Sequence, residues 1–157
     1  MLRPATIDIR RDDLTGEAVR RLIERHLRGM HEFSPPESVH AFDIDKLRDP
    51  KVLFWSAWVG EEIAGCGALK LLEARRGEIK SMRVADAFLG KGVGRAMLDH
   101  IMVEARALGL ASLWLETGSP APFLPALKLY ESAGFQRCGP FDGYADDPFS
   151  VFMTRTL

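Results

Sequence analysis

The chain has little of several features that mark specialised classes of protein. Only two of its 157 residues are cysteine, Cys66 and Cys138, which is too few for a disulfide framework and favours a reducing compartment. The formal net charge is −1 without a dense basic stripe, which argues against a nucleic-acid partner and against strong attraction to anionic membranes. The longest strongly apolar run, Val52–Val59, is far too short to span a bilayer. The opening residues MLRPATIDIRRDD are charged and lack the apolar core of a signal peptide. We therefore expect a cytoplasmic protein with no membrane partner.

What the sequence does contain is typical of one folded domain. Hydrophobic residues make up 46% of the chain and charged residues 27%, as in ordinary globular proteins. A chain of 157 residues is long enough to bury one full core. No internal repeat, low-complexity segment or linker interrupts it, so we expect a single domain over residues 1–157.

The hydrophobic periodicity predicts a series of strands and helices. The predicted strands are Ala5–Arg10, Val52–Val59, Glu62–Leu72, Glu78–Val84, Ser112–Thr117, Phe135–Cys138 and Ser150–Thr156. The predicted helices are Leu14–Met30, with Thr15 as its cap, Ser38–Leu47, Gly92–Leu108 and Leu124–Ala133. The order βααβββαβαββ gives an antiparallel meander, one β–α–β unit and a last hairpin. This is a mixed α/β (α+β) fold around one sheet, and it differs from an alternating doubly wound fold.

Three glycines, Gly90, Gly92 and Gly94, follow a predicted strand and lie at the start of a predicted helix. A P-loop is excluded because Gly92 is followed by Val93 and Gly94 instead of lysine and a hydroxyl residue. A Rossmann fingerprint is excluded because the spacing is G-x-G-x-G and the preceding strand belongs to a hairpin. Backbone N–H groups over residues 91–94 would be free to bind a phosphate at the helix N-terminus. The alternative is a glycine turn without a ligand.

The segments EIKSMRV, FLGKGVGRAML, LWLET and LKLYESAGF, in this order, resemble the GNAT superfamily of acyl-CoA-dependent N-acyltransferases. The family's Arg/Gln-x-x-Gly-x-Gly/Ala motif falls on residues 89–94, and its Tyr…Gly-Phe ending falls on Tyr130, Gly134 and Phe135. The resemblance covers about residues 62–135 well, and the order of elements fits along the whole chain. It implies the GNAT fold and an N-acetyltransferase that uses acetyl-CoA. The chain departs from the family at Leu89, where Arg or Gln is usual, and at Phe123, where many members have Asn.

The resemblance also implies roles for individual residues. Glu78 aligns with a glutamate that some members use as general base, and Tyr130 with the tyrosine that protonates the departing thiolate. The alternative for Glu78 is a solvated carboxylate at the strand end, and the alternative for Tyr130 is an aromatic residue at the edge of the core. In the family this strand and the next splay apart to form a slot for pantetheine, which the backbone would bind like an added strand. The implied CoA-binding residues are Met82, Arg83, Val84, Leu89, Gly90, Lys91, Gly92, Val93, Gly94, Arg95 and Phe123.

Family members usually form the acceptor pocket from the first two helices and the C-terminal hairpin. The corresponding segments here, residues 31–40 and 139–144, mix carboxylates, aromatic rings and hydroxyls, which suits a small polar ligand. The candidate acceptor residues are Glu32, Ser34, Glu37, His40, Thr117 and Tyr144. A proline turn without a binding role is the alternative for the first segment.

These observations predict an enzyme that moves an acetyl group from acetyl-CoA to a primary amine of a small molecule or to an exposed amino group. A catalytically silent acyl-CoA-binding or regulatory module is the alternative. The four histidines show no metal-ligand spacing, so we expect no metal. A homodimer is common in the family, but these residues do not fix the oligomeric state.

Overall fold

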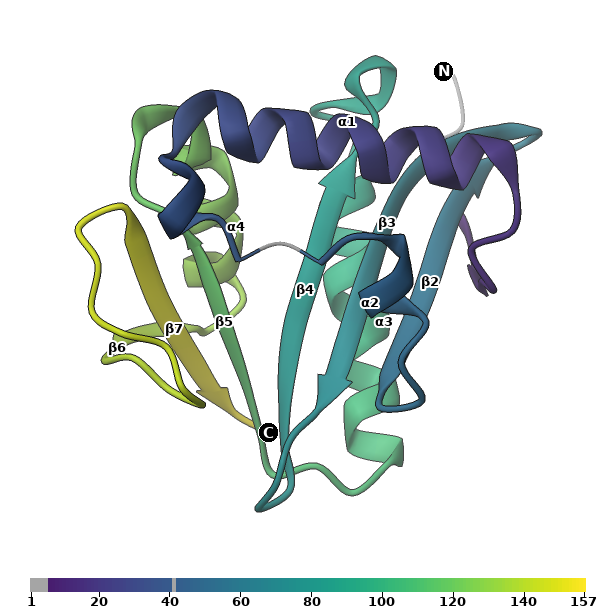
Figure 1. Ribbon diagram of the computed structural model, residues 1–157. Coiled ribbons are helices and arrows are strands. Elements are labelled where there is room, and N and C mark those ends of the chain that lie inside the picture. Colours follow the sequence, from purple (N-terminus) through teal and green to yellow (C-terminus); the bar gives the residue numbers. More distant parts are fainter. Residues whose placement is uncertain (1–5, 41) are drawn as a thin grey trace.

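The computed structural model describes residues 6–40 and 42–157, which form a seven-stranded mixed sheet flanked by helices (Figure 1). The strands follow the spatial order β1-β2-β3-β4-β5-β7-β6. Their bounds are β1 Asp8–Arg11, β2 Val52–Val59, β3 Glu62–Leu71, β4 Arg76–Val84, β5 Ser112–Gly118, β6 Gln136–Cys138 and β7 Ser150–Thr156. The helices are α1 Glu17–Phe33, α2 Ile44–Leu47, α3 Val93–Ala107 and α4 Leu124–Ser132, with 3-10 turns η1 Pro36–Ser38, η2 Asp86–Phe88 and η3 Ala121–Phe123. The predicted order of strands and helices is confirmed.

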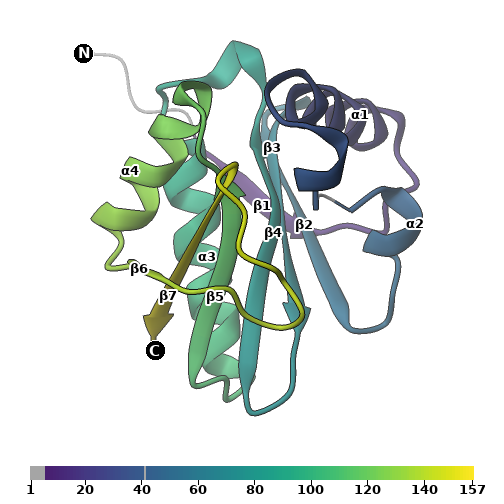
Figure 2. The same ribbon diagram turned by 60° about the vertical axis from the view of Figure 1, so that its left-hand side comes forward.

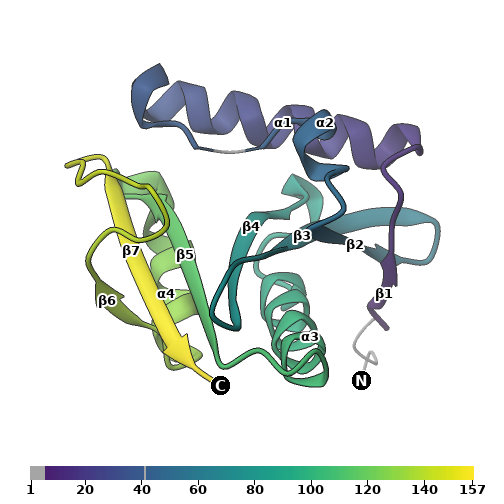
Figure 3. The same cartoon turned by 60° about the horizontal axis from the view of Figure 1, so that its bottom comes forward.

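The helices cover both faces of the sheet, with α1 and α2 on one face and α3 and α4 on the other (Figures 2 and 3). Each face has its own apolar core. Ile23 of α1 and Leu47 of α2 pack with Phe54 and Cys66 of the sheet, whereas Met97 of α3 belongs to the core on the opposite face. Burying each large side chain of this kind contributes about 1.5–3 kcal/mol to folding. No helix among the described residues is long and apolar enough to cross a bilayer.

The parallel pairing of β4 with β5 is short, and the two strands then diverge (Figure 1). Residue pairs are formed from Arg76 with Ser112 to Ile79 with Leu115, and the predicted β–α–β unit is confirmed by this parallel pairing. Beyond Ile79, β4 continues to Val84 while paired on its other side with β3, where the register shifts near Gly67. The backbone of β4 on its β5 side is therefore open beyond Ile79.

Three local predictions differ from the structure. Helix α1 begins at Glu17 after Gly16, and the Thr15 hydroxyl donates to Asp13 Oδ1 (2.6 Å) instead of capping the helix. The predicted helix over residues 38–47 is reduced to α2, which is capped by Asp43 accepting the Lys46 N–H (2.9 Å). Strand β4 begins at Arg76, so residue 78 lies inside the strand and not at its start. Ala5, the predicted start of the first strand, lies outside the described residues.

Candidate active site

A cleft of about 660 Å³ lies between the diverging parts of β4 and β5 and is bounded by α1, the glycine loop and α4. A smaller cavity of about 40 Å³ lies on the α1 side, lined by residues of β4, β5 and the segment after α1. We call them the large cleft and the small cavity. They share a wall, which is formed by His26, Met30, Ile79, Lys80, Ser81 and Glu116.

The glycine loop forms one end of the large cleft and leaves backbone amides free. Gly90 and Gly92 have φ values of 74° and 82°, in the region that favours glycine, and nothing lies within 4 Å of the Cβ that either residue lacks. Gly92 is the N-cap of α3, and the first helical bond runs from the Ala96 N–H to the Gly92 carbonyl (3.0 Å). The N–H groups of residues 93–95 therefore have no acceptor within the helix. Such amides at a helix N-terminus bind an anionic group, and no acidic side chain occupies this first turn.

Gly94 has a different role from the two glycines before it. A Cβ at Gly94 would lie 3.2 Å from Leu129 Cδ2 and 3.5 Å from Val84 Cγ2. Its small size therefore allows the start of α3 to pack closely against α4 and β4.

The side chains of the glycine loop add little positive charge to the cleft. Leu89 is 62% exposed and apolar. The Lys91 ammonium lies 5.4 Å from the centre of the Phe88 ring, and Lys91 is the one predicted CoA residue that does not line the large cleft. Arg95 lines the cleft, but its guanidinium donates to Asp99 Oδ1 (3.0 Å). The residues predicted for CoA that do line the large cleft are Met82, Arg83, Val84, Leu89, Gly90, Gly92, Val93, Gly94, Arg95 and Phe123.

Phe123 forms part of the cleft wall. Its ring lies over Gly118, where the added Cβ of any other residue would collide with the ring. It also meets Phe33 of α1 edge to face, with the ring centres 6.4 Å apart. At this position the chain therefore supplies an apolar contact between β5 and α1.

Tyr130 lies on α4 and lines the large cleft. The residue is buried, and its ring packs at an angle against Phe135, with the centres 5.7 Å apart. Burial raises the pKa of the Tyr130 phenol, so the hydroxyl stays protonated at neutral pH. Tyr130 thus brings a protonated hydroxyl to the cleft wall.

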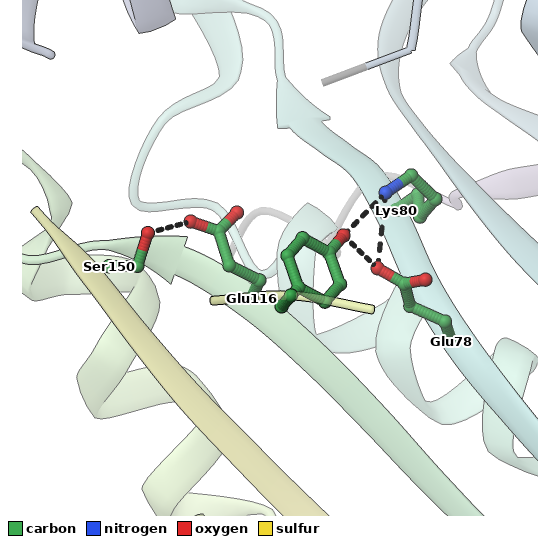
Figure 4. Close-up of polar contacts among 5 residues, drawn as sticks. Glu78, Lys80, Glu116 and Ser150 are labelled. Carbon is green, nitrogen blue, oxygen red and sulfur yellow. Dashed lines mark hydrogen bonds and ion pairs between the residues drawn. The ribbon is translucent and has the colours of Figure 1, made fainter. Parts of the chain in front are cut away.

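Glu78 is held in a buried network of hydrogen bonds, and Figure 4 shows its carboxylate beside Lys80. Its Oε2 accepts hydrogen bonds from Lys80 Nζ (3.1 Å) and from the Tyr144 hydroxyl (2.5 Å), and Lys80 Nζ also donates to that hydroxyl (3.0 Å). The side chains of Lys80 and Glu78 are only 6% and 3% exposed. Lys80 Nζ also lies 4.2 Å from the centre of the Phe42 ring. Neither Glu78 nor Tyr144 lines the cleft or the cavity. The carboxylate thus balances a buried lysine, which does not suit the role of general base predicted for it.

Glu116 of β5 lines both the large cleft and the small cavity, and it was absent from the predicted site. Its Oε2 accepts a hydrogen bond from Ser150 Oγ (2.7 Å) of β7 (Figure 4). Burial raises the pKa of this carboxyl to about 7, and the charge of Glu78 adds to the rise, while the Ser150 bond and Lys80 oppose it. A carboxylate that titrates near neutral pH in a cleft can accept a proton from an incoming group.

The predicted acceptor residues are only partly brought together. Ser34 and His40 line the small cavity, and Thr117 lines the large cleft. Tyr144 lies behind the wall, where it meets the His40 ring edge to face at 5.0 Å. Glu32 of α1 and Glu37 of η1 are exposed and line neither space.

Comparison with known proteins places these features among acetyltransferases. The model of the Acetyltransferase (GNAT) family matches residues 17–135. The chain is 57% identical over 149 residues to the uncharacterized N-acetyltransferase YsnE of Bacillus subtilis, covering 95% of this chain and 99% of that protein. It is 38% identical over 152 residues to the IAA acetyltransferase of Azospirillum brasilense, covering 96% and 98%. A solved structure of a Bacillus subtilis acetyltransferase in complex with CoA has a TM-score of 0.72 at 19% identity, covering 97% of this chain and 99% of that one, and supports the fold.

Proposed function

The chain belongs to the GNAT family of acetyltransferases, and from this premise we propose that it transfers an acetyl group from acetyl-CoA directly to a primary amine of a small molecule or to an exposed amino group. One observation carries the proposal: the Glu116 carboxyl, with a pKa of about 7, lines the same cleft as the Tyr130 phenol and the free amides of the glycine loop. We place the enzyme in the cytoplasm, where Cys66 and Cys138 remain thiols.

The residues of the large cleft fit CoA. The amides of residues 93–95 and the open space at Gly90 and Gly92 suit a diphosphate. The open edge of β4 at residues 82–84 suits the amide groups of pantetheine, which would pair with it as a strand does. When bound, acetyl-CoA supplies an acetyl group activated as a thioester.

Replacing Gly92 by valine is expected to weaken CoA binding by roughly tenfold to a hundredfold, because valine strains the backbone at this φ and fills the open space with a branched side chain. Isothermal titration calorimetry with CoA measures the effect, and circular dichroism checks the fold. Gly139→Val is the matched control, since Gly139 is exposed, has open space around it and lies outside the cleft. Unchanged CoA affinity in Gly92→Val would remove the glycine loop from the phosphate site.

Two side chains of the cleft supply the proton transfers that the reaction needs. Glu116 accepts a proton from the acceptor, and its pKa near 7 lets it do so at neutral pH and leave a neutral, nucleophilic amine. The Tyr130 hydroxyl, which stays protonated, donates to the departing thiolate. A cysteine nucleophile is not required: the Cys66 thiol donates to the Ser81 carbonyl (3.2 Å), and burial raises its pKa to about 12.

A panel of amines, amino acids and peptides, incubated with acetyl-CoA, tests the proposed function. Thiol-reactive reagents measure the release of CoA, and mass spectrometry identifies the acetylated product. We expect CoA release that depends on the acceptor. CoA binding without turnover across the whole panel would favour a silent CoA-binding module.

Replacing Tyr130 by phenylalanine is expected to lower kcat about a hundredfold, because the departing thiolate loses its proton donor. The aromatic packing against Phe135 is kept, so CoA affinity and the thermal midpoint of unfolding should stay close to wild type. Steady-state kinetics at saturating acetyl-CoA, together with calorimetry, separates the two effects. An unchanged kcat would make Tyr130 a packing residue only.

A further inference from the structure

Two arginines converge on one side of the large cleft. Arg25 comes from α1 and Arg83 from β4, and both line the cleft. Their Nη1 atoms lie 3.3 Å and 3.1 Å from the position that a Cβ of Gly29 would occupy. A glycine inside a helix is less favourable than alanine, so the helix is locally less stable at Gly29, where the two guanidinium groups meet.

This arrangement leaves positive charge uncompensated. Among the described residues, Asp86 is the carboxylate that pairs with both arginines, at 3.4 Å from Arg25 Nε and 3.6 Å from Arg83 Nη2, and it is 61% exposed. The Arg83 side chain is only 24% exposed. Burial and the charge of Arg25 lower the pKa of the Arg83 guanidinium, which remains charged at neutral pH. Two like charges held together at a partly buried site are unfavourable unless an anion joins them.

Beside the arginines, the wall shared by the two spaces carries polar atoms without protein partners. His26 and Ser81 are 4% and 7% exposed, and His26 Nδ1 and Ser81 Oγ make no hydrogen bond within the described part of the chain. Burial and the charge of Arg83 lower the pKa of His26 to about 4, so its imidazole is neutral and can share hydrogen bonds with a polar ligand. Buried polar groups of this kind normally have hydrogen-bond partners, which indicates that a bound molecule supplies the missing partners here.

The arginines lie on the acceptor side of β4. Arg83 is paired across the strands with Cys66, which packs in the core under α1 and α2. Its neighbour Val84 contacts Gly94 of α3, on the opposite face, where the amides of the glycine loop are. A group held by Arg83 and Arg25 therefore lies on the α1 side, in the cleft that Glu116 also lines.

We propose that Arg25 and Arg83 bind a carboxylate of the acceptor, so that the substrate class is an amine that also carries a carboxylate, such as a free amino acid. The inference rests on the proposed function, because it assigns the acceptor of the same reaction. Paired guanidinium groups bind carboxylates through charge-assisted hydrogen bonds, and a molecule anchored there can present its amine to Glu116. The family resemblance implies a binding role for the backbone of Arg83 only.

The experiment compares free amino acids with their carboxamides, which keep the amine and the side chain but lack the anionic group. Calorimetry measures their binding to CoA-saturated protein, and mass spectrometry measures acetylation. The variants are Arg83→Gln and Arg25→Gln, with Arg28→Gln as the control, since Arg28 is exposed on α1 and lies outside the cleft. We expect wild type to prefer at least one acid over its carboxamide by about tenfold to a hundredfold. Both cleft variants should lose this preference while their Kd for CoA stays within about twofold, and Arg28→Gln should retain it.

The outcomes separate the two proposals. Binding of acids that depends on the arginines, without acetylation, would support the carboxylate site and count against the acetyl transfer. Acetylation of carboxamides as efficiently as acids, or the absence of any carboxylate-dependent binding, would overturn the site and leave acetyl transfer standing. Loss of CoA affinity in Arg83→Gln or Arg25→Gln, with preference for the acid retained, would assign the arginines to the phosphates of CoA and would also overturn it.

Discussion

Replacing Glu116 by glutamine is expected to lower kcat/KM for acetyl transfer by about a hundredfold to ten-thousandfold, because an amide cannot accept the proton of the acceptor amine. The side-chain oxygen of glutamine still accepts the hydrogen bond from Ser150 Oγ, so the local structure and the affinity for CoA should be retained. Steady-state kinetics with a competent acceptor, and calorimetry with CoA, measure the two quantities.

The pH profile gives this prediction a second readout. The folded-state pKa of Glu116 is raised to about 7, so the carboxyl is protonated and inactive as a base below that pH and ionised above it. The wild-type rate should therefore rise with pH up to about 7 and then level off, and Glu116→Gln should lack this rise. Glu61→Gln, a change of the same kind at an exposed residue that lines neither space, is the control and should behave as wild type. A normal rate and a normal profile in Glu116→Gln would exclude Glu116 as the base.

Replacing Glu78 by glutamine is expected to lower the free energy of unfolding by about 3–5 kcal/mol, because it leaves the Lys80 ammonium buried without its counter-charge. The ion pair is 3.1 Å long and almost fully buried, so solvent screens it little. Urea denaturation monitored by circular dichroism measures the loss. The double variant Glu78→Gln/Lys80→Met should recover part of the stability, because no unpaired charge then remains in the wall.

Together, the two glutamate variants show which glutamate acts as the general base and which one stabilises the fold. If Glu78 were the base, Glu78→Gln would abolish the rise of the rate with pH at little cost in stability, and Glu116→Gln would leave the profile intact. The contacts favour the reverse, since Glu78 faces Lys80 and Tyr144 whereas Glu116 lines the cleft.

The order of elements and the place of the glycine loop could be predicted from the sequence, because both depend on local patterns. Apolar periodicity marks the strands and helices, and Gly92 stands where α3 begins. The pairing of Glu78 with Lys80 could also be predicted, because residues two apart on a strand share a face.

Glu116 was missed because its environment is made by distant parts of the chain. In SLWLETG it is the polar member of an alternating strand, but Ser150 of β7 holds its carboxylate and the divergence of β4 from β5 opens the cleft that it lines. The predicted helix over residues 38–47 failed for a related reason. Ser38 is bonded to Asp147 Oδ2 (2.6 Å), a contact across most of the chain that no local pattern reveals, and Asp43 supplies the cap of a shorter helix.

The pairing of β4 with β5 ends at Ile79, and this determines which contacts can contribute binding energy for acetyl-CoA. Beyond Ile79, β4 pairs with no strand on that side within the described part of the chain, so no strand pairing is broken when a ligand enters. Each hydrogen bond to such a ligand replaces one to water, and the net gain per bond is about 1 kcal/mol. In the proposed complex the open edge would therefore set the direction and register of the pantetheine chain, and most of the affinity would come from the diphosphate and from apolar contacts with Phe123 and Leu129.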